Sequence, residues 1–178
     1  MESITLVEVP EKQKSVLRQL VELYEYDLSP FTGYELNEHG YYGYSYLDYY
    51  WTEKERFAYF IMLDEKIAGF VLVNDYCEAS REPDAKAIAE FFVMKAFRRK
   101  GIGQHTAKSI FDLFPGAWEI HQYLDNKESV IFWEKVVGEY TSGDFEKKVV
   151  ITDDGKQQVI LFNNIKNQNK SAHATATG

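Results

Sequence analysis

The sequence predicts an α/β domain in which a mixed, mostly antiparallel central sheet is flanked by helices. Strand-like and helix-like patterns of apolar residues follow one another in the order β, α, loop, β, β, β, α, β, α, β, β. The chain has 178 residues and is 45% hydrophobic, which is enough to bury one core. We expect a single domain over residues 1–163. Residues 164–178 are polar, small and without periodicity, and we expect a flexible tail there.

The first elements follow from local signals. Residues 4–9 alternate as a strand does, and Pro10 suits the first turn of a following helix. Ser29 and Pro30 are expected to end that helix, because proline cannot continue the hydrogen-bond ladder. The apolar face of this helix comprises Val16, Leu17, Leu20, Val21, Tyr24 and Leu28. Residues 31–56 then form a section rich in tyrosine and acidic residues, with poor periodicity.

Two hairpins are predicted from apolar runs separated by turn residues. Residues 57–63 and 67–74 flank Asp64-Glu65-Lys66, and residues 145–152 and 156–163 flank Asp153-Asp154-Gly155. The periodicity between the hairpins predicts a strand over residues 85–94, a helix from Gly103 that Pro115-Gly116 stops, a strand over residues 117–124 and a helix over residues 126–137.

The charge and the cysteine count argue against several classes of function. A net charge of −8 and a pI near 5.1 argue against nucleic-acid binding and against an anionic membrane surface. No stretch reaches the length of a membrane span and no signal-peptide pattern opens the chain, so we expect a cytoplasmic protein. Cys77 is the only cysteine and the four histidines lack ligand spacing, so we expect a passive thiol and no metal site.

The junction between the strand over residues 85–94 and the helix after it predicts an anion-binding turn. Arg98, Arg99 and Lys100 precede the helix N-terminus, where unpaired N–H groups carry a partial positive charge. Gly101 and Gly103 lack a Cβ, so the backbone there can take φ > 0 and a diphosphate can approach closely. The spacing fits neither a Walker loop nor a dinucleotide fingerprint. The alternative is an ordinary turn with solvated basic residues.

This junction resembles the Arg/Gln-x-x-Gly-x-Gly/Ala signature of the GNAT superfamily of N-acetyltransferases, here Arg98-Arg99-Lys100-Gly101-Ile102-Gly103. The order of elements over residues 3–163 is similar to that family's as well. The resemblance implies the GNAT acyl-CoA N-acyltransferase fold, with acetyl-CoA as co-substrate and no metal.

The resemblance also implies which residues bind acetyl-CoA. The pantetheine arm would pair with the strand at Phe91, Phe92 and Val93, and the diphosphate would lie on the turn. A last helix would begin beside the cofactor arm at Asn126, although Asn126 is equally well explained as a helix cap. The residues implied are Phe91, Phe92, Val93, Arg98, Arg99, Lys100, Gly101, Ile102, Gly103, Gln104, Asn126 and Ser129.

Acetyl transfer to an amine needs a base, an oxyanion donor and help for the leaving thiolate. Glu90 is the candidate base, because it is the one carboxylate in the apolar residues 87–94 and burial would raise its pKa. Residues 90–94 also resemble polyamine acetyltransferases, which carry a second acid where this chain has Ala89. A carboxylate paired with a neighbouring cation is the alternative reading. The family analogy assigns the oxyanion donor to a backbone N–H near Val93.

The residue expected to protonate the leaving thiolate of coenzyme A differs from the one found in many members of the family. Many GNATs use the tyrosine of a Phe-Tyr pair in the last helix as the acid, but here the pair is Phe132-Trp133, and an indole N–H cannot act as that acid. Another group, such as one of the tyrosines, would serve, or coenzyme A would leave as the thiolate.

The acceptor is expected to be a small cationic molecule with a primary amine. Glu35, Glu38, Asp48, Glu53 and Glu55 lie among tyrosines in residues 31–56, where GNATs commonly build the acceptor pocket. Solvated acids and packed aromatics are the alternative. An acetyl-CoA-binding sensor without turnover, or an acetyltransferase for protein N-termini or lysines, remains open as a function. A homodimer is a possible assembly, which the sequence does not decide.

Overall fold

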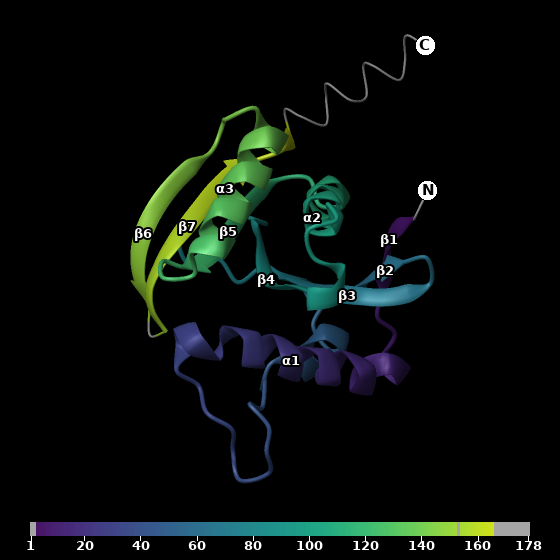
Figure 1. Cartoon of the computed structure of the whole chain (residues 1–178). Coiled ribbons are helices and arrows are strands. Elements are labelled where there is room, and N and C mark those ends of the chain that lie inside the picture. Colours follow the sequence, from purple (N-terminus) through teal and green to yellow (C-terminus); the bar gives the residue numbers. More distant parts are fainter. Residues whose placement is uncertain (1–2, 153, 166–178) are drawn as a thin grey trace. The chain divides into compact units, whose positions relative to one another are not determined.

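The structure is a computed structural model that describes residues 3–152 and 154–165 (Figure 1). Its strands form one seven-stranded sheet in the order β1-β2-β3-β4-β5-β7-β6. β4 and β5 are parallel, whereas β1–β2, β2–β3, β5–β7 and β6–β7 are antiparallel. This mixed sheet with flanking helices confirms the predicted fold class. The described residues form two compact units, one made of those up to Asn74 with Ala89–Ile102, the other of Asp75–Ile88 with the described residues from Gly103 onward.

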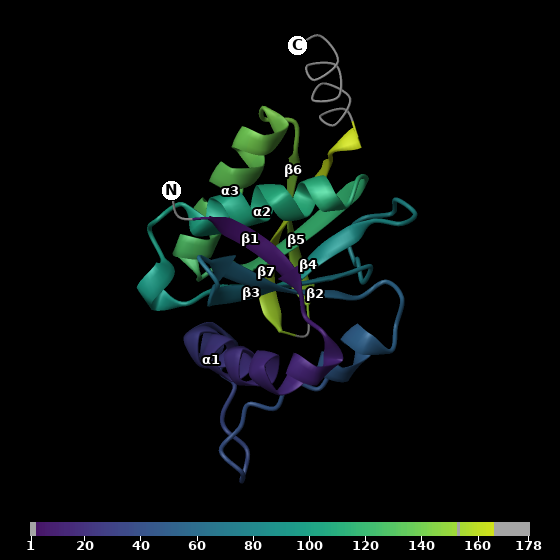
Figure 2. The ribbon, with the colours of Figure 1, turned by 90° about the vertical axis from the view of Figure 1, so that its right-hand side faces the viewer.

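The first unit packs a long helix on a group of strands. Its elements are β1 (Ile4–Glu8), η1 (Glu11–Gln13), α1 (Lys14–Thr32), η2 (Leu47–Trp51), β2 (Phe57–Leu63), β3 (Lys66–Asn74), the larger part of β4 (Lys86–Val93) and η3 (Lys95–Phe97). α1 runs along the strands β2 and β3 (Figures 1 and 2). Leu17 and Val21 of α1 are buried in one apolar core with Phe60, Phe70 and Phe92 of the strands. The apolar face predicted for α1 therefore meets the sheet.

The first hairpin is confirmed, with a tighter turn than expected. Leu63 pairs with Lys66, so the turn contains only Asp64 and Glu65. Both residues have positive φ, 44° and 67°, as a two-residue turn matching the twist of the strands requires. Lys66 is the first residue of β3 and not part of the turn.

The predicted end of α1 was wrong. The helix continues through Pro30 to Thr32 and ends at Gly33, whose φ is 69°. Pro30 has no N–H for the carbonyl of Tyr26, but the Ser29 hydroxyl donates a hydrogen bond of 2.8 Å to that carbonyl instead. The serine before the proline therefore supports the helix that the pair was expected to end.

The second unit packs two helices against each other and against the remaining strands. Its elements are α2 (Ile102–Leu113), β5 (Ala117–Tyr123), α3 (Lys127–Thr141), β6 (Glu146–Thr152) and β7 (Gly155–Asn163). The rings of Phe111 on α2 and Tyr140 on α3 lie 5.1 Å apart, and Tyr140 donates a hydrogen bond of 2.7 Å to Asp112. The elements predicted from residue 103 onward are confirmed, although α3 extends beyond residue 137 to Thr141.

The first two residues beyond β7 are part of the second unit. Asn164 belongs to the expected tail, yet it is fully buried, and its side chain bonds to Gly116 N at 2.7 Å and to Phe111 O at 2.6 Å. The tail expected over residues 166–178 lies outside the described residues. No helix in the described parts of the chain is long and apolar enough to cross a membrane. That the described residues constitute one domain stays a prediction.

Candidate functional site

β4 presents alternate backbone groups to its two sides. A Cβ on Gly69 of β3 would lie 1.9 Å from the Phe92 carbonyl oxygen, and Met94 N–H donates to Ala68 O at 2.9 Å. Phe92 and Met94 therefore direct their backbone groups toward β3. Because these directions alternate along a strand, Phe91 and Val93 direct theirs away from β3. This orientation suits the predicted pairing with a pantetheine arm and the predicted oxyanion donor near Val93.

Glu90 on β4 lies beside two tyrosines from the aromatic and acidic section. Tyr44 and Tyr50 both lie near enough to Glu90 to feel the charge of its carboxylate. Burial first, and then the negative charge of Glu90, raises the pKa of each tyrosine far above its ordinary value, so both phenols stay neutral. Glu90 itself is half-buried. The candidate base thus has two neutral phenols nearby.

The Tyr50 hydroxyl differs from that of Tyr44. Tyr50 is 5% exposed, and its oxygen is buried without a hydrogen-bond partner. Tyr44 and Arg56 lie nearby, but neither makes a hydrogen bond of normal geometry with this oxygen. The Arg56 guanidinium instead stacks over the Tyr50 ring, 5.7 Å from its centroid. Sequence reasoning missed both Tyr44 and Tyr50 because their section lacks periodicity.

The basic turn has a backbone suited to an anion. Arg99 and Gly101 have φ of 63° and 78°, and Ile102 begins α2. Left-handed residues next to a helical one gather successive N–H groups on one side of the chain, as anion-binding turns do. Arg99, Lys100 and Gly101 are exposed. These residues therefore fit the diphosphate of coenzyme A, and that role stays a prediction.

Arg98 interacts with α1 in the structure. Its Nη2 lies 2.5 Å from Asp27 Oδ2 on α1, its Nε donates to Val93 O at 2.6 Å, and its guanidinium lies over the Phe92 ring. Lys95 also pairs with Asp27 at 3.0 Å. Burial opposes ionisation of Asp27, but the bonds and charges of Arg98 and Lys95 hold its pKa below the ordinary value. Arg98 thus ties the start of the turn to α1.

The remaining predicted cofactor residues lie in the second unit. Gly103 is the second residue of α2 and does not have positive φ, so the freedom that its missing Cβ allows is used only at Gly101. The Gln104 side chain donates to Glu139 of α3, which Lys108 also contacts at 3.0 Å. Asn126 is the N-cap of α3, because its Oδ1 accepts the N–H of Ser129 at 3.1 Å. The capping role of Asn126 is confirmed, whereas cofactor contacts of these residues stay predictions.

Trp133 and Cys77 offer little proton chemistry. Trp133 is 5% exposed and packs 5.0 Å from the ring of Phe132, so its indole belongs to the core of the second unit. Burial and the nearby charges of Glu119 and Asp75 raise the pKa of the Cys77 thiol to about 12. A thiol protonated at neutral pH is a poor nucleophile.

A second carboxylate, Glu119 on β5, is saturated with partners. Its side chain is 0% exposed and accepts backbone N–H groups from Glu78 at 2.8 Å, Ala79 at 2.9 Å and Ser80 at 2.6 Å. His121 Nε2 lies 2.6 Å from Glu119 Oε1. The i, i+2 spacing of Glu119 and His121 on a strand was a signal that they share one face.

The pKa values of Glu119 and His121 are shifted in opposite directions. His121 Nδ1 lies 2.8 Å from Gln157 Oε1, so both ring nitrogens face oxygens and the doubly protonated imidazolium fits best. Burial opposes the charge on each partner. Hydrogen bonds and mutual attraction nevertheless lower the pKa of Glu119 and raise that of His121. The arrangement holds residues 78–80 against β5.

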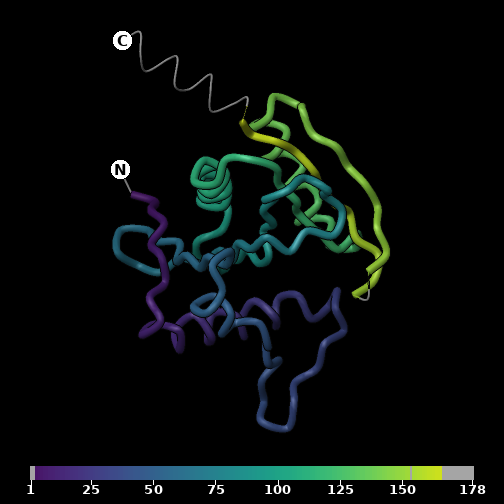
Figure 3. The backbone as a smooth tube through the Cα atoms, turned by 180° about the vertical axis from the view of Figure 1, so that it is seen from behind, coloured from purple at the N-terminus to yellow at the C-terminus, as the bar shows by residue number. Residues whose placement is uncertain are grey.

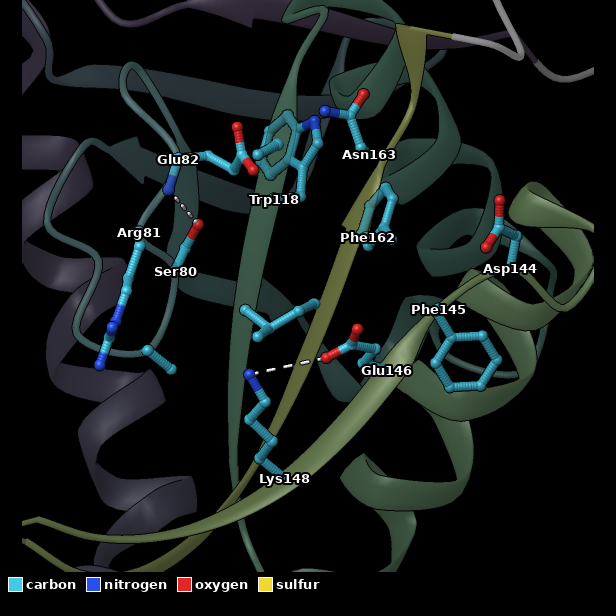
Figure 4. Close-up of a pocket in the computed structure, with 13 residues that line it drawn as sticks. Ser80, Arg81, Glu82, Trp118, Asp144, Phe145, Glu146, Lys148, Phe162 and Asn163 are labelled. Carbon is cyan, nitrogen blue, oxygen red and sulfur yellow. Dashed lines mark hydrogen bonds and ion pairs between the residues drawn. The ribbon is translucent and has the colours of Figure 1, made fainter.

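The second unit also has an open cavity of about 640 Å³. Trp118, Phe162 and Leu161 line it together with charged side chains of both signs, including Arg81, Glu82, Glu146 and Lys148 (Figure 4). Lys148 lies 3.6 Å from Glu146. None of the predicted site residues lines this cavity. Because its charges are mixed and partly paired, it favours neither an anionic nor a cationic ligand.

Comparisons with known proteins agree with the fold. The model of the acetyltransferase (GNAT) family matches residues 20–138. Aminoglycoside acetyltransferase AAC(6')-Ib in complex with coenzyme A has a similar structure, with a TM-score of 0.69, 16% identity, and coverage of 94% of this chain and 98% of that chain. An acetyltransferase from Thermus thermophilus has a TM-score of 0.66 and 14% identity, with coverage of 92% of this chain and 99% of that chain.

A third similar structure is a chimera of spermidine N-acetyltransferase SpeG from Vibrio cholerae and hSSAT. Its TM-score is 0.64 at 12% identity, with coverage of 93% of this chain and 98% of that chain. A search of curated proteins found no significant match. At these identities the similar structures show a shared fold, and the family model covers more than half of the sequence. The chain belongs to the GNAT acetyltransferase family.

Proposed function

We propose that this protein is an N-acetyltransferase that transfers the acetyl group of acetyl-CoA to a primary amine of a small cationic molecule. The observation that carries the proposal is Glu90, a half-buried carboxylate on β4 that lies among neutral phenols. Tyr44, Tyr50 and Glu90 belong to the same unit as the exposed basic turn at Arg99 to Gly101. The unit thus supplies both a base and a suitable anion site.

The chemistry follows from these groups. A primary alkylammonium has a pKa of about 10.4, so it must lose a proton before its nitrogen can attack. Glu90 accepts this proton, and the nitrogen lone pair then attacks the thioester carbonyl carbon. A carbon–nitrogen bond forms and the carbon–sulfur bond breaks. The nitrogen gives up its second proton to water, and the products are an N-acetyl amide and coenzyme A. The N–H of Val93, directed away from β3, would stabilise the oxyanion on the way.

The leaving sulfur receives no proton from Trp133, because this residue is buried and carries only an indole N–H. Coenzyme A would leave as the thiolate. This departure needs no acid, because a thiol with a pKa of about 8.5 is a moderate leaving group. This step separates the chain from family members with a tyrosine acid on the last helix.

The cationic character of the acceptor rests on the section over residues 31–56. Glu35, Glu38 and Glu55 are exposed there, as are the rings of Tyr34, Tyr41 and Tyr46. The first part of this section, which follows α1, protrudes as a long loop (Figure 3). Carboxylates and aromatic faces attract ammonium groups. Structures similar to this chain include proteins described as aminoglycoside and spermidine acetyltransferases, whose named acceptors are polycations.

Two of the five predicted acids are occupied by cations of the chain. Asp48 pairs with Lys14 at 2.9 Å and Arg18 at 3.3 Å, and Glu53 pairs with Arg56 at 2.5 Å. The pairs of Asp48 attach η2 to α1, and the pair of Glu53 with Arg56 lies just after η2. Glu35 and Glu38 are therefore the better candidates for attracting an acceptor.

Trp133 gives one observation in favour of a second function, an acetyl-CoA-binding sensor without turnover. An amine panel separates the two functions. Purified protein would be mixed with acetyl-CoA and with spermidine, kanamycin, single amino acids or peptides, while release of the coenzyme A thiol is followed. Turnover with a polycation supports the proposal. Acetyl-CoA binding without thiol release above hydrolysis supports the sensor, and turnover of peptides alone supports a protein acetyltransferase.

A further inference from the structure

Two buried side-chain polar atoms in the described residues lack a hydrogen-bond partner, and one of them is the Tyr50 hydroxyl beside Glu90. Leaving a buried hydroxyl without a hydrogen bond is unfavourable, so such groups in folded proteins call for an explanation. Tyr44 and Arg56 lie near this oxygen, but neither makes a hydrogen bond of normal geometry with it. Arg56 offers its cation to the ring of Tyr50 and its Nε to Glu53.

We infer that the Tyr50 hydroxyl is a ligand of the acceptor ammonium, which it holds beside Glu90 before the proton is removed. This inference rests on the proposed function and adds a positioning group for the acceptor nitrogen. A primary ammonium has three N–H donors and no acceptor. The Glu90 carboxylate and the Tyr50 oxygen supply acceptors for it. The hydroxyl oxygen of Tyr44, which lies near both groups, has lone pairs for a third N–H.

The class of ligand follows from this set of groups. A carboxylate and two neutral phenol oxygens accept hydrogen bonds, so they match a donor-only group such as a primary ammonium. They match a carbonyl or a phosphate poorly, because Glu90 repels both. Rigid placement supports the role: Tyr50 belongs to the core of the first unit, and Trp51 next to it donates to Val9 O at 2.9 Å. The hydroxyl is therefore fixed in position before an acceptor arrives.

The test is the substitution Tyr50→Phe, which removes only the hydroxyl and keeps the ring under Arg56. In the free protein the lost group has no partner, so the midpoint of thermal unfolding should stay unchanged or rise. The KM for spermidine should rise about 10- to 100-fold, as expected when a hydrogen bond to a charged group is lost. The Kd for acetyl-CoA should not change.

Tyr49→Phe is the matched control. Tyr49 precedes Tyr50 in η2 and its ring also lies under Arg56, at 5.2 Å, but the residue is 43% exposed. This variant should behave as the parent in every assay. Isothermal titration of spermidine into protein saturated with coenzyme A gives a second readout, in which Tyr50→Phe should bind at least about 10-fold more weakly than the parent.

The outcomes separate the inference from the proposed function. If the parent acetylates spermidine and Tyr50→Phe does so with an unchanged KM, the inference fails and the proposed function stands. A clear fall in the unfolding midpoint of Tyr50→Phe, with kinetics unchanged, would assign the hydroxyl a structural role. If the parent neither binds nor acetylates spermidine or any other amine tested, the proposed function and the inference both fail.

Discussion

Two glutamates on strands of this protein have opposite surroundings. Glu119 is fully buried and accepts bonds from three backbone N–H groups and an imidazole. Glu90 is half-buried, and the groups beside it are neutral phenols, one of them without a partner. A carboxylate whose acceptor sites are filled by its own chain holds the fold together. The unpartnered hydroxyl near Glu90 is the observation from which we infer that this carboxylate meets a ligand.

The largest expected effect concerns the saturated carboxylate. Glu119→Ala should lower the free energy of unfolding by about 3–5 kcal/mol, because it leaves His121 and the N–H groups of residues 78–80 without their anion. Denaturant titration followed by circular dichroism measures this. Glu146→Ala removes an exposed acid from β6 and should cost little. A loss below about 1 kcal/mol for Glu119→Ala would mean that the network is not structural.

The next effect concerns the basic turn. Gly101 has a φ of 78° with no atom within 4 Å of an added Cβ, so Gly101→Ala introduces only backbone strain, of about 1–2 kcal/mol. If the turn relaxes to relieve the strain, the Kd for acetyl-CoA should rise up to about 10-fold in calorimetry. Gly143→Ala is matched in φ and in free space but lies after α3. Equal affinities for acetyl-CoA in both variants would place the diphosphate elsewhere.

The titration of the saturated pair gives a pH test of its charge. The pKa of His121 is raised in the folded state, so its stabilisation is complete below the ordinary value of 6.5 and is lost as pH rises through the folded pKa. The pKa of Glu119 is lowered, so its stabilisation is present above 4.5 and is lost as pH falls through the folded pKa.

The pair should therefore stabilise the protein most between about pH 4.5 and 6.5. On the alkaline side the free energy of unfolding should decrease by about 1.4 kcal/mol for each unit by which the folded pKa of His121 exceeds the unfolded one. Unfolding measured from about pH 6 to 9 tests this, with His121→Asn as the comparison. If the free energy of unfolding of His121→Asn depends on pH as that of the parent does, the imidazolium of His121 does not contribute to stability.

The smallest effect concerns the exposed acids. The variant Glu35→Gln with Glu38→Gln should raise the KM for spermidine a few-fold and weaken its dependence on salt, because attraction between exposed charges is screened over about 8 Å. A control with the same net charge replaces Glu65 and Glu146 by glutamine. If the control variant raises the KM for spermidine as much, the effect comes from the net charge of the protein and not from the position of Glu35 and Glu38.

Local signals in the sequence predicted most of the fold, because each hairpin or helix is encoded by neighbouring residues. The end of α1 was not predicted, because the helix continues through Pro30. The Ser29 hydroxyl there replaces the backbone N–H that proline lacks as a donor to the carbonyl of Tyr26. The candidate site was predicted only in part. Glu90 and the basic turn follow from composition and spacing within one short stretch.

The partners of these groups come from distant parts of the chain. Tyr44 and Tyr50 reach Glu90 from a section without periodicity, and Asp27 lies 71 residues from Arg98. Tertiary packing brings such residues together, so no local pattern reports them. The pair at Glu119 and His121 is intermediate: its spacing on a strand predicts a shared face, but not the three N–H groups that converge on the carboxylate.

The kinetics of Glu90→Gln test the central claim most directly. The amide keeps the shape of the side chain but cannot take a proton from the ammonium. For the best acceptor of the amine panel, kcat/KM should fall about 100-fold or more, while the Kd for acetyl-CoA and the free energy of unfolding stay near those of the parent. Glu65→Gln in the exposed hairpin turn serves as the control. An unchanged kcat/KM over the whole pH range would contradict the assignment of Glu90 as the base.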